Sequence, residues 1–210
     1  MNYAYGSAKT DSNLVPDVTE MSITAPDVRQ QISLHKNNTD LTKINFDQTI
    51  YIIWAGANDY FFNLNLSPFA VVVSLMNDIN DLIQLSTNHI IIVNQPPFQS
   101  YPAVVGLNIS SYLNQLTLAH NSNLSNVMQS LQLNFSNVSL ELFDAYSRIT
   151  NILMSSSTYG VNSTKNCWDT SNHTSIQMCS SPDTYIFIGE YHFTTRAHQK
   201  IADNAHVYYL

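Results

Sequence analysis

The sequence is poor in glycine, in charge and in long apolar runs. Only 5 of its 210 residues are glycine, which leaves little room for the Gly-rich loops that cradle phosphates. Charged residues make up 11 % of the chain, less than half of the roughly 25 % common in soluble domains. The formal net charge of −7 argues against nucleic-acid binding, which depends on a basic surface. No apolar run reaches the roughly 18 residues that a membrane-spanning helix needs.

What the chain does have is an ordinary share of apolar residues, 44 %, so it is not a disordered sequence. Its polarity comes from asparagine and serine instead of charge. A length of 210 residues suits one α/β domain and is short for two. We therefore expect a single domain over residues 1–210, with a core large enough to fold without metals or disulfides.

Several features point to the secretory pathway. N-x-S/T sequons are frequent and lie at Asn37, Asn65, Asn108, Asn123, Asn134, Asn137, Asn162 and Asn172. A chain rich in asparagine and serine also generates some sequons by chance. The first residues, Met1 to Tyr5, show neither the basic nor the apolar part of a signal peptide. These observations favour a secreted protein whose leader is missing from this sequence.

The two cysteines, Cys167 and Cys179, have no second cysteine pair or histidine cluster nearby that would complete a zinc site. We expect a disulfide between them. It would stabilise the fold by about 3 kcal/mol in the chain-entropy description.

Four apolar segments are predicted to be strands. Gln48 to Ala55 and Asn88 to Asn94 are continuous, β-branched runs typical of buried parallel strands, and Val138 to Phe143 is a third. Tyr185 to Ile188 is a shorter candidate.

Amphipathic helices are predicted between these strands, over Ser67 to Leu85, Tyr101 to Leu131, Tyr146 to Met154 and Thr194 to Tyr208. The second could be broken near Asn121 to Asn123. Strands that alternate with helices predict a parallel sheet covered by helices, and ligands of such sheets bind beyond the carboxyl ends of the strands.

Two long segments show no clear periodicity. Gly6 to Asp47 gives no assignment, and Ser155 to Ser181, which holds both cysteines, is interpreted as a surface loop.

The first candidate site follows the first strong strand, at Gly56-Ala57-Asn58-Asp59-Tyr60. A turn there would aim the Asn58 amide into the crevice, where a hydrogen-bond donor can stabilise an oxyanion by roughly 2.7–4 kcal/mol. The alternative is an ordinary turn, since Gly, Asn and Asp are common turn residues.

The second candidate follows the last short strand, in the segment Gly189 to Thr195. His192 at this position could act as a general base, although a helix-capping turn that happens to contain histidine explains it equally well. The other six histidines are interpreted as structural or solvated. No H-E-x-x-H sequence and no cluster with metal-ligand spacing is present.

Taken together, segments spread over the whole chain resemble the GDSL/SGNH hydrolases, and among them the secreted fungal acetylesterases of carbohydrate esterase family 16. The resemblance rests on the sequences at Asn2–Ala8, Gly56–Asp59, Cys167–Trp168, Cys179–Asp183 and Glu190–His198.

The resemblance implies a flavodoxin-like three-layer α/β/α sandwich with a parallel sheet, and hydrolysis of an acyl or acetyl ester through a serine nucleophile. It also implies that Gly6 and Asn58 form the oxyanion hole and that His192 is the base. The implied substrate is a small-molecule or carbohydrate ester. No cofactor or metal is expected.

Two departures from the family pattern stand out. The sequence has no G-D-S and no G-x-S-x-G, and the position three residues before His192 is Gly189 where the family has aspartate. Glu190 is one residue further along and is not counted as a substitute. Loss of the serine costs about 2 × 10⁶ in the turnover of subtilisin, so we predict that these 210 residues alone are not a competent esterase.

In the family's strand order, 2-1-3-4-5, the nucleophile strand would lie between the Tyr3 region and the Gln48 to Ala55 strand. Without it, that strand is predicted to be an exposed apolar edge. The leading hypothesis is an N-terminally truncated, secreted ester hydrolase. The alternatives are a pseudo-hydrolase that binds glycans or esters without cleaving them, and a gene remnant without function.

Overall fold

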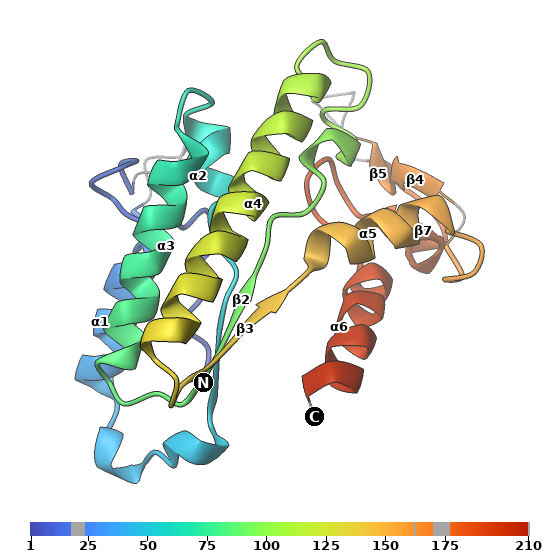
Figure 1. The fold of residues 1–210 in the computed structure, drawn as a ribbon. Helices are drawn as coiled ribbons and strands as arrows, with labels where there is room; N and C mark the ends of the chain where they lie inside the picture. The colour runs from blue at the N-terminus through green and yellow to red at the C-terminus, as the bar shows by residue number, and fades with distance from the viewer. Residues whose placement is uncertain (18–23, 162, 170–176, 210) are drawn as a thin grey trace. The chain divides into compact units, whose positions relative to one another are not determined.

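The computed structural model describes residues 1–17, 24–161, 163–169 and 177–209, and it divides into two compact units (Figure 1). The first unit comprises residues 1–95 and 118–143, and the second comprises residues 96–117 and 144–210. Each unit is described by itself.

The first unit contains a parallel sheet of three strands in the order β1-β2-β3. The strands are β1 (Ile50–Ile53), β2 (His89–Val93) and β3 (Ser139–Phe143). In the register, Ile52 lies opposite Ile91, which lies opposite Glu141. Three of the predicted strands and the parallel sheet are therefore confirmed.

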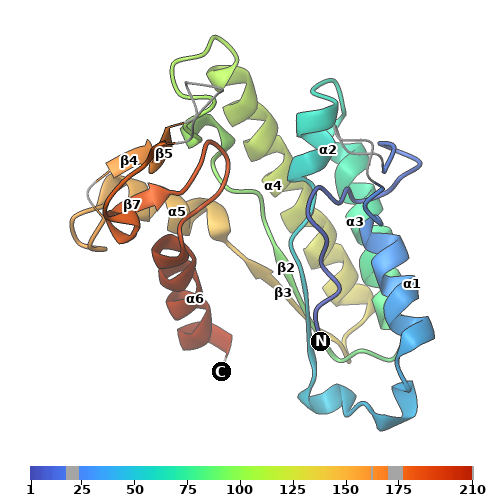
Figure 2. The ribbon, with the colours of Figure 1, turned by 180° about the vertical axis from the view of Figure 1, so that it is seen from behind.

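Helices cover one face of this sheet. They are α1 (Val28–Asn38), α3 (Pro68–Ile83) and α4 (Ser110–Asn134), and in Figures 1 and 2 they lie along the strands. Their apolar side chains form one core with those of the strands: Val28, Ile53, Val72, Leu75, Ile79, Leu82, Ile90, Ile92, Leu124, Met128, Leu131 and Val138. The α/β layering expected from the alternating pattern is present in this unit.

Helix α1 lies within the segment that showed no periodicity. Asp27 caps it by accepting from the Gln30 backbone N–H, and the Gln30 side chain accepts from Asp27 N in return. This capping box satisfies two backbone donors at the helix start. Short 3₁₀ helices at Leu41–Lys43 and Phe46–Gln48 lead into β1.

Helix α4 starts later than predicted and is not broken. It begins at Ser110, after turns that follow a 3₁₀ helix at Phe98–Ser100. At the expected break, Asn121 Nδ2 donates to Gln95 O at 2.9 Å, and Gln95 N donates to Asn121 Oδ1 at 2.8 Å. A tertiary contact thus satisfies the polar side chain that suggested an interruption.

In the second unit, β7 (Tyr185–Phe187) confirms the predicted short strand. Its partner is β4 (Ser163–Asn166), in parallel orientation and in a sheet separate from β1-β2-β3. A second pair, β5 (Trp168–Asp169) and β6 (Gln177–Met178), is antiparallel. The interpretation of Ser155 to Ser181 as an irregular loop is therefore wrong, because β4, β5 and β6 lie in it.

A disulfide joins Cys167 and Cys179, with an S–S distance of 1.98 Å and Cα atoms 5.0 Å apart. Cys179 N also donates to Cys167 O at 3.0 Å. The predicted disulfide is therefore confirmed. It links the two ends of the β5–β6 pair.

The helices of the second unit are α5 (Ala145–Met154) and α6 (Thr195–Tyr209), with a 3₁₀ turn at Pro182–Thr184. The predicted helices at both places are confirmed. The buried rings of Phe187 and Phe193 stack with centroids 5.1 Å apart, and Tyr101 meets both rings at 5.8 and 5.9 Å.

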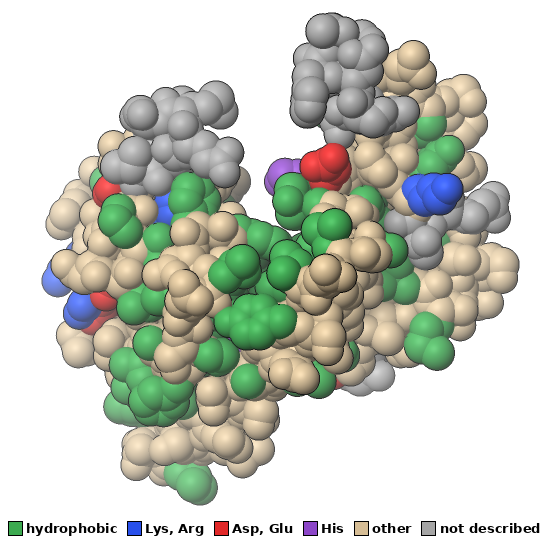
Figure 3. All heavy atoms as spheres, turned by 90° about the horizontal axis from the view of Figure 1, so that it is seen from above, with side chains coloured by type: hydrophobic (Ala, Val, Ile, Leu, Met, Phe, Trp, Pro, Cys, Tyr) green, Lys and Arg blue, Asp and Glu red, His purple; other side chains and the backbone are tan. Residues whose placement is uncertain are grey.

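The surface carries little charge. Figure 3 shows few Lys, Arg, Asp and Glu side chains on the face drawn, among mostly neutral and apolar ones, in keeping with the charged fraction of 11 %. None of the described helices is both long and apolar enough to span a bilayer.

Candidate active site

Asn58 lies in α2 (Ala57–Phe62), a short helix that starts shortly after β1 ends at Ile53. Gly56 precedes this helix and has a φ of +112°. Residues that carry a Cβ atom rarely adopt this backbone conformation. A Cβ atom on Gly56 would lie 2.9 Å from Gln95 Nε2 and 3.3 Å from His120 Cε1. Glycine is thus required here both by the backbone and by the close packing, and the predicted turn is the start of a helix.

The Asn58 side chain is half-buried and reaches the loop at residues 6–8. Its Nδ2 donates to Ala8 O at 2.9 Å. In that loop, Ser7 has a φ of +64°, and Gly6 is exposed with no atom within 4 Å of the position of a Cβ. The structure therefore places two of the three predicted site residues, Gly6 and Asn58, on neighbouring segments at the carboxyl end of β1.

Beneath this loop lies a buried polar cluster that the sequence analysis missed. The carboxylate of Asp59 accepts from Thr10 N at 3.1 Å and from Thr10 Oγ1 at 2.6 Å. Lys9 is fully buried, with Nζ 3.8 Å from the centroid of the Phe62 ring, a cation–π contact. The cluster fastens residues 8–10 to α2, the helix that carries Asn58. The aspartate of the G-A-N-D sequence was the available signal for it.

Burial raises the pKa of Asp59 to about 6, although its hydrogen bonds from Thr10 and the charge of Lys9 lower it. Its carboxylate therefore titrates close to neutral pH, unlike an ordinary exposed aspartate.

A second cluster of buried polar side chains, Tyr60, Gln95 and His120, packs next to Gly56 at the start of α2. Tyr60 Oη and His120 Nδ1 lie 2.7 Å apart, and Gln95 Nε2 donates to Ala55 O at 2.6 Å. Burial lowers the pKa of His120 to about 4, so this imidazole is neutral at physiological pH. His120 thus has a structural environment, as interpreted from the sequence.

His192 lies in the second unit, in the turn between β7 and α6. The turn is closed by Ile188 N, which donates to His192 O at 2.8 Å, and by a bridge between Phe187 and Phe193. The imidazole itself is exposed and has no hydrogen-bond partner among the described residues. It is therefore free to meet a substrate or a nucleophile.

Helix α6 starts directly after this turn. Thr194 Oγ1 accepts from Ala197 N at 3.1 Å and donates to Tyr185 O at 2.7 Å. Thr194 thus anchors the helix start to β7. The segment is thus a helix-capping turn, with Thr194 as the capping residue. This does not conflict with a role of the neighbouring His192 as a general base.

Among the residues that the structure describes, no carboxylate is hydrogen-bonded to the His192 ring. Gly189 stands at the family's aspartate position, and a Cβ there would meet nothing within 4 Å. Glu190 is exposed, and its backbone oxygen accepts from Ala103 N at 3.4 Å. The second unit has room for an aspartate side chain at position 189.

Within the described part of the chain, no group of histidine, cysteine, aspartate and glutamate residues could hold a metal ion. In the first unit, the Asn58 amide and the backbone N–H groups of residues 6–8 are donors of the kind that stabilise an oxyanion.

A sequence profile of the GDSL-like lipase/acylhydrolase family matches residues 1–205. The chain belongs to this family. The expected SGNH α/β hydrolase fold is thereby confirmed.

Two GDSL esterases/lipases of Arabidopsis thaliana are similar to the chain. One is 24 % identical over 202 residues, which cover 83 % of this chain and 56 % of the relative. The other is 24 % identical over 240 residues, which cover 97 % of this chain and 67 % of the relative. The chain thus spans between about half and two thirds of the length of these relatives.

Proposed function

We propose that the complete protein is an ester hydrolase and that these 210 residues supply its oxyanion hole and its general base. The observation that carries the proposal is the contact of the Asn58 amide with the loop of Gly6, at the carboxyl end of a parallel strand, in a chain of the GDSL-like family. Because no G-D-S sequence is present, we propose that the nucleophilic serine lies in sequence that precedes residue 1.

In the proposed mechanism, the serine hydroxyl attacks the ester carbonyl while His192 accepts its proton. The Asn58 side-chain amide and the Gly6 backbone N–H donate to the oxyanion that forms. His192 then returns the proton to the leaving alcohol, and water hydrolyses the acyl-enzyme by the same steps in reverse order. With glycine at position 189, His192 works as part of a Ser–His dyad, oriented by a backbone carbonyl.

For the substrate, we propose an acetyl or short acyl ester on a carbohydrate, from the resemblance to the fungal acetylesterases. Both units belong to one hydrolase domain in this proposal. It further places the complete protein outside the cell. The disulfide supports this, as do the exposed sequon asparagines Asn37, Asn108, Asn134 and Asn137; the sequons at Asn162 and Asn172 lie outside the described residues.

A second candidate function is a non-catalytic module that binds glycans or esters. The observation in its favour is Gly189, because a missing N-terminal segment does not explain the loss of the aspartate. The same residues would then bind a substrate that is never cleaved.

Acetylated oligosaccharides distinguish the two functions in protein expressed from the complete reading frame. The hydrolase releases acetate, and His192→Ala lowers turnover by at least about 10³, in line with the loss of a catalytic base. Gly189→Asp raises turnover, because a carboxylate would orient the imidazole, and the open space at this position accommodates it. Binding without acetate release in both the wild type and Gly189→Asp would contradict the hydrolase and support the binding module.

A further inference from the structure

An open polar pocket lies along helix α1 in the first unit. Its volume is about 500 Å³, within the range of roughly 300–1,000 Å³ that is typical of small-ligand sites. Residues 11–13 form one side of the pocket. The helix forms the other side with Arg29, Gln30, Ser33, Leu34 and Asn37.

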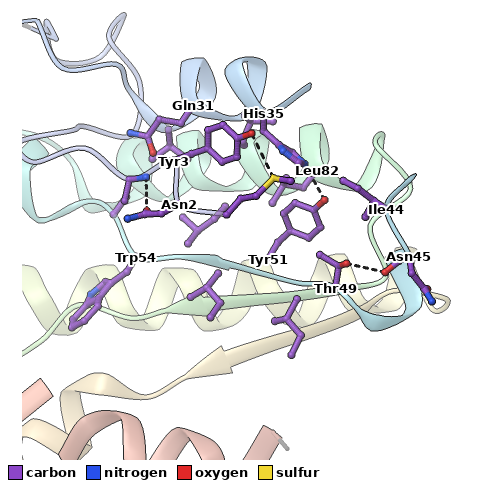
Figure 4. Close-up of a pocket in the computed structure, with 18 of the residues that line it drawn as sticks. Asn2, Tyr3, Gln31, His35, Ile44, Asn45, Thr49, Tyr51, Trp54 and Leu82 are labelled. Carbon is purple, nitrogen blue, oxygen red and sulfur yellow. Dashed lines mark hydrogen bonds between the residues drawn. The ribbon is translucent and has the colours of Figure 1, made fainter. Parts of the chain in front are cut away.

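Helix α1 turns two different faces to its surroundings. Val28 and His35 are its buried residues, and Figure 4 shows His35 between Tyr3 and Tyr51, whose hydroxyl lies 3.0 Å from His35 Nε2. The pocket-lining side chains recur at three- and four-residue steps, so they share the opposite face. One face thus packs α1 onto the first unit, and the other face holds the pocket.

The side of the pocket that faces the helix is held in place by Asp27. Its Oδ2 accepts from Ser12 N at 2.7 Å, while its Oδ1 accepts from Gln30 N at 2.7 Å. Next to it, Asp11 Oδ1 accepts from the backbone N of Asn13 at 2.8 Å and from its Nδ2 at 2.9 Å. Because these hydrogen bonds tie residues 11–13 to the start of α1, the pocket is preformed.

Charged ligands do not suit this pocket. An anion would meet the carboxylate of Asp11, and the cation of the pocket, Arg29, is already paired with Asp81 at 2.9 Å. Asp27 is buried and uses both carboxylate oxygens for backbone N–H groups. Among the residues that the structure describes, no carboxylate-containing group could hold a metal ion. The pocket therefore favours a neutral ligand.

The lining has the mixture of groups that a sugar ring requires. The side-chain amides of Asn13 and Gln30 are exposed and can both donate and accept hydrogen bonds, as the Ser33 hydroxyl can. Leu34 is half-buried and adds an apolar surface. A sugar carries hydroxyl groups around its edge and C–H groups on its faces, so it can use both parts of this lining.

Asn37 lines the pocket and begins the N-glycosylation sequon Asn37-Asn38-Thr39. It lies in the last turn of α1, and its side chain is exposed. Because side chains of a helix lean towards its N-terminus, a group attached to Asn37 extends over Ser33 and Leu34, into the pocket. A sugar linked there has an effective concentration of about millimolar, so weak contacts are enough to hold it.

We propose that Asn37 carries an N-linked glycan whose first sugar lies in this pocket, between α1 and residues 11–13. The inference rests on the extracellular location proposed above, and it is independent of ester hydrolysis. The donor is an oligosaccharide linked to a lipid diphosphate. The amide nitrogen of Asn37 forms the bond to the anomeric carbon, the bond from that carbon to the diphosphate oxygen breaks, and the lipid diphosphate and one amide proton leave.

The glycan has a structural consequence for α1. This helix buries only Val28 and His35, so it has little apolar packing of its own. A sugar against Leu34 covers the exposed face of the helix and contacts the loop at residues 11–13. The glycan thus stabilises α1 and this loop together.

Peptide mapping tests the modification on protein expressed from the complete reading frame in a eukaryotic host that attaches N-glycans. Release of the glycans by a peptide-N-glycosidase in heavy-oxygen water converts each occupied asparagine to labelled aspartate. We expect the label at Asn37 in most molecules. Label at other sequons with Asn37 unlabelled would overturn this site alone. Absence of label at every sequon would overturn the site and also contradict the proposed extracellular location.

Amide hydrogen exchange tests whether the sugar lies in the pocket. An endoglycosidase first trims each glycan to a single N-acetylglucosamine, and this protein is compared with Asn37→Gln. We expect the sugar to slow exchange in residues 11–13 and 27–37 at least about threefold. Asn108→Gln, at an exposed sequon of the second unit, is the control and should leave this exchange unchanged. Occupied Asn37 without slower exchange would overturn the docking of the sugar.

A pair of variants keeps the sequon and changes the pocket. Ser33→Glu places a charged side chain in the pocket, and Lys36→Glu places the same side chain on α1 outside the pocket lining; both positions are exposed. The sugar should still slow exchange in Lys36→Glu and should no longer do so in Ser33→Glu. Equal slowing in both variants would overturn the pocket as the place of the sugar.

Ester hydrolysis is measured on the same samples, so that the two proposals are separated. Hydrolysis by protein whose Asn37 is unmodified would contradict the glycan site alone. Slower exchange with the sugar in a protein that cleaves no ester would support the glycan site and contradict the proposed hydrolase alone.

Discussion

Gly56 offers a sharp test of how the site is built, because replacing it with alanine adds one methyl group where the structure has no room. The new Cβ would lie 2.9 Å from Gln95 Nε2 and 3.3 Å from His120 Cε1, and both side chains are fully buried. Gln95 Nε2 also donates to Ala55 O at 2.6 Å, so it cannot retreat without losing that hydrogen bond.

The expected loss of stability has two parts. A left-handed backbone costs a residue with a Cβ about 1–2 kcal/mol, and the φ of Gly56 is +112°. Overpacking of a buried site costs about 1–3 kcal/mol more. We therefore expect Gly56→Ala to lower the free energy of unfolding by about 2–5 kcal/mol.

Urea denaturation followed by circular dichroism measures this loss, and the other glycines provide graded controls. Gly106 has a φ of +83° and open space around it, so Gly106→Ala should cost about 1 kcal/mol from the backbone alone. Gly6 and Gly189 have neither feature, and their alanine variants should stay within about 0.5 kcal/mol of the wild type. A Gly56→Ala protein as stable as Gly6→Ala would refute the reasoning.

Two further predictions concern stability. Asp78 of α3 is buried, its Oδ2 has no hydrogen-bond partner, and burial together with Asp27 and Asp81 raises its pKa to about 9. Because this folded-state pKa lies above the ordinary value of 3.8, its contribution to stability is complete below pH 4 and is lost as the pH rises towards 9. Asp78→Asn should therefore gain at least about 1 kcal/mol over the wild type at pH 8 and flatten the pH profile of thermal unfolding; an unchanged profile would contradict the burial of a carboxylate. Replacing Cys167 and Cys179 together with serine should lower the stability of the second unit by about 2–4 kcal/mol, seen as faster proteolysis there, and equal cleavage rates would contradict this.

The sequence was most informative where apolar periodicity was strong. The strands β1 to β3 and the helices α3, α5 and α6 follow from continuous apolar runs and three-to-four-residue spacing, and the structure has them close to the predicted bounds. These signals are reliable because burial itself selects the pattern.

Elements held by polar or tertiary contacts left weaker signals. Helix α1 buries only Val28 and His35 and is stabilised by its capping box, so it shows little periodicity. The short strands β4 to β6 pair next to a disulfide, and two- to four-residue strands leave no periodic pattern.

The candidate site was visible in part. Asn58 was a candidate from its turn after the strand, Gly6 was identified by the resemblance, and the two lie on neighbouring segments. The burial of Lys9, Thr10 and Asp59 beneath them could not be predicted, because a lysine is almost always exposed and only the folded loop shows what surrounds it.

The central proposal is that the Asn58 amide donates to the oxyanion in ester cleavage. The most direct measurement is the hydrolysis of p-nitrophenyl acetate by protein from the complete reading frame, with Asn58→Ala compared to the wild type. We expect turnover to fall by about 10²–10³, as for the loss of one oxyanion donor, while the Michaelis constant changes little. Turnover that is unaffected by Asn58→Ala would contradict the role of Asn58 as an oxyanion donor.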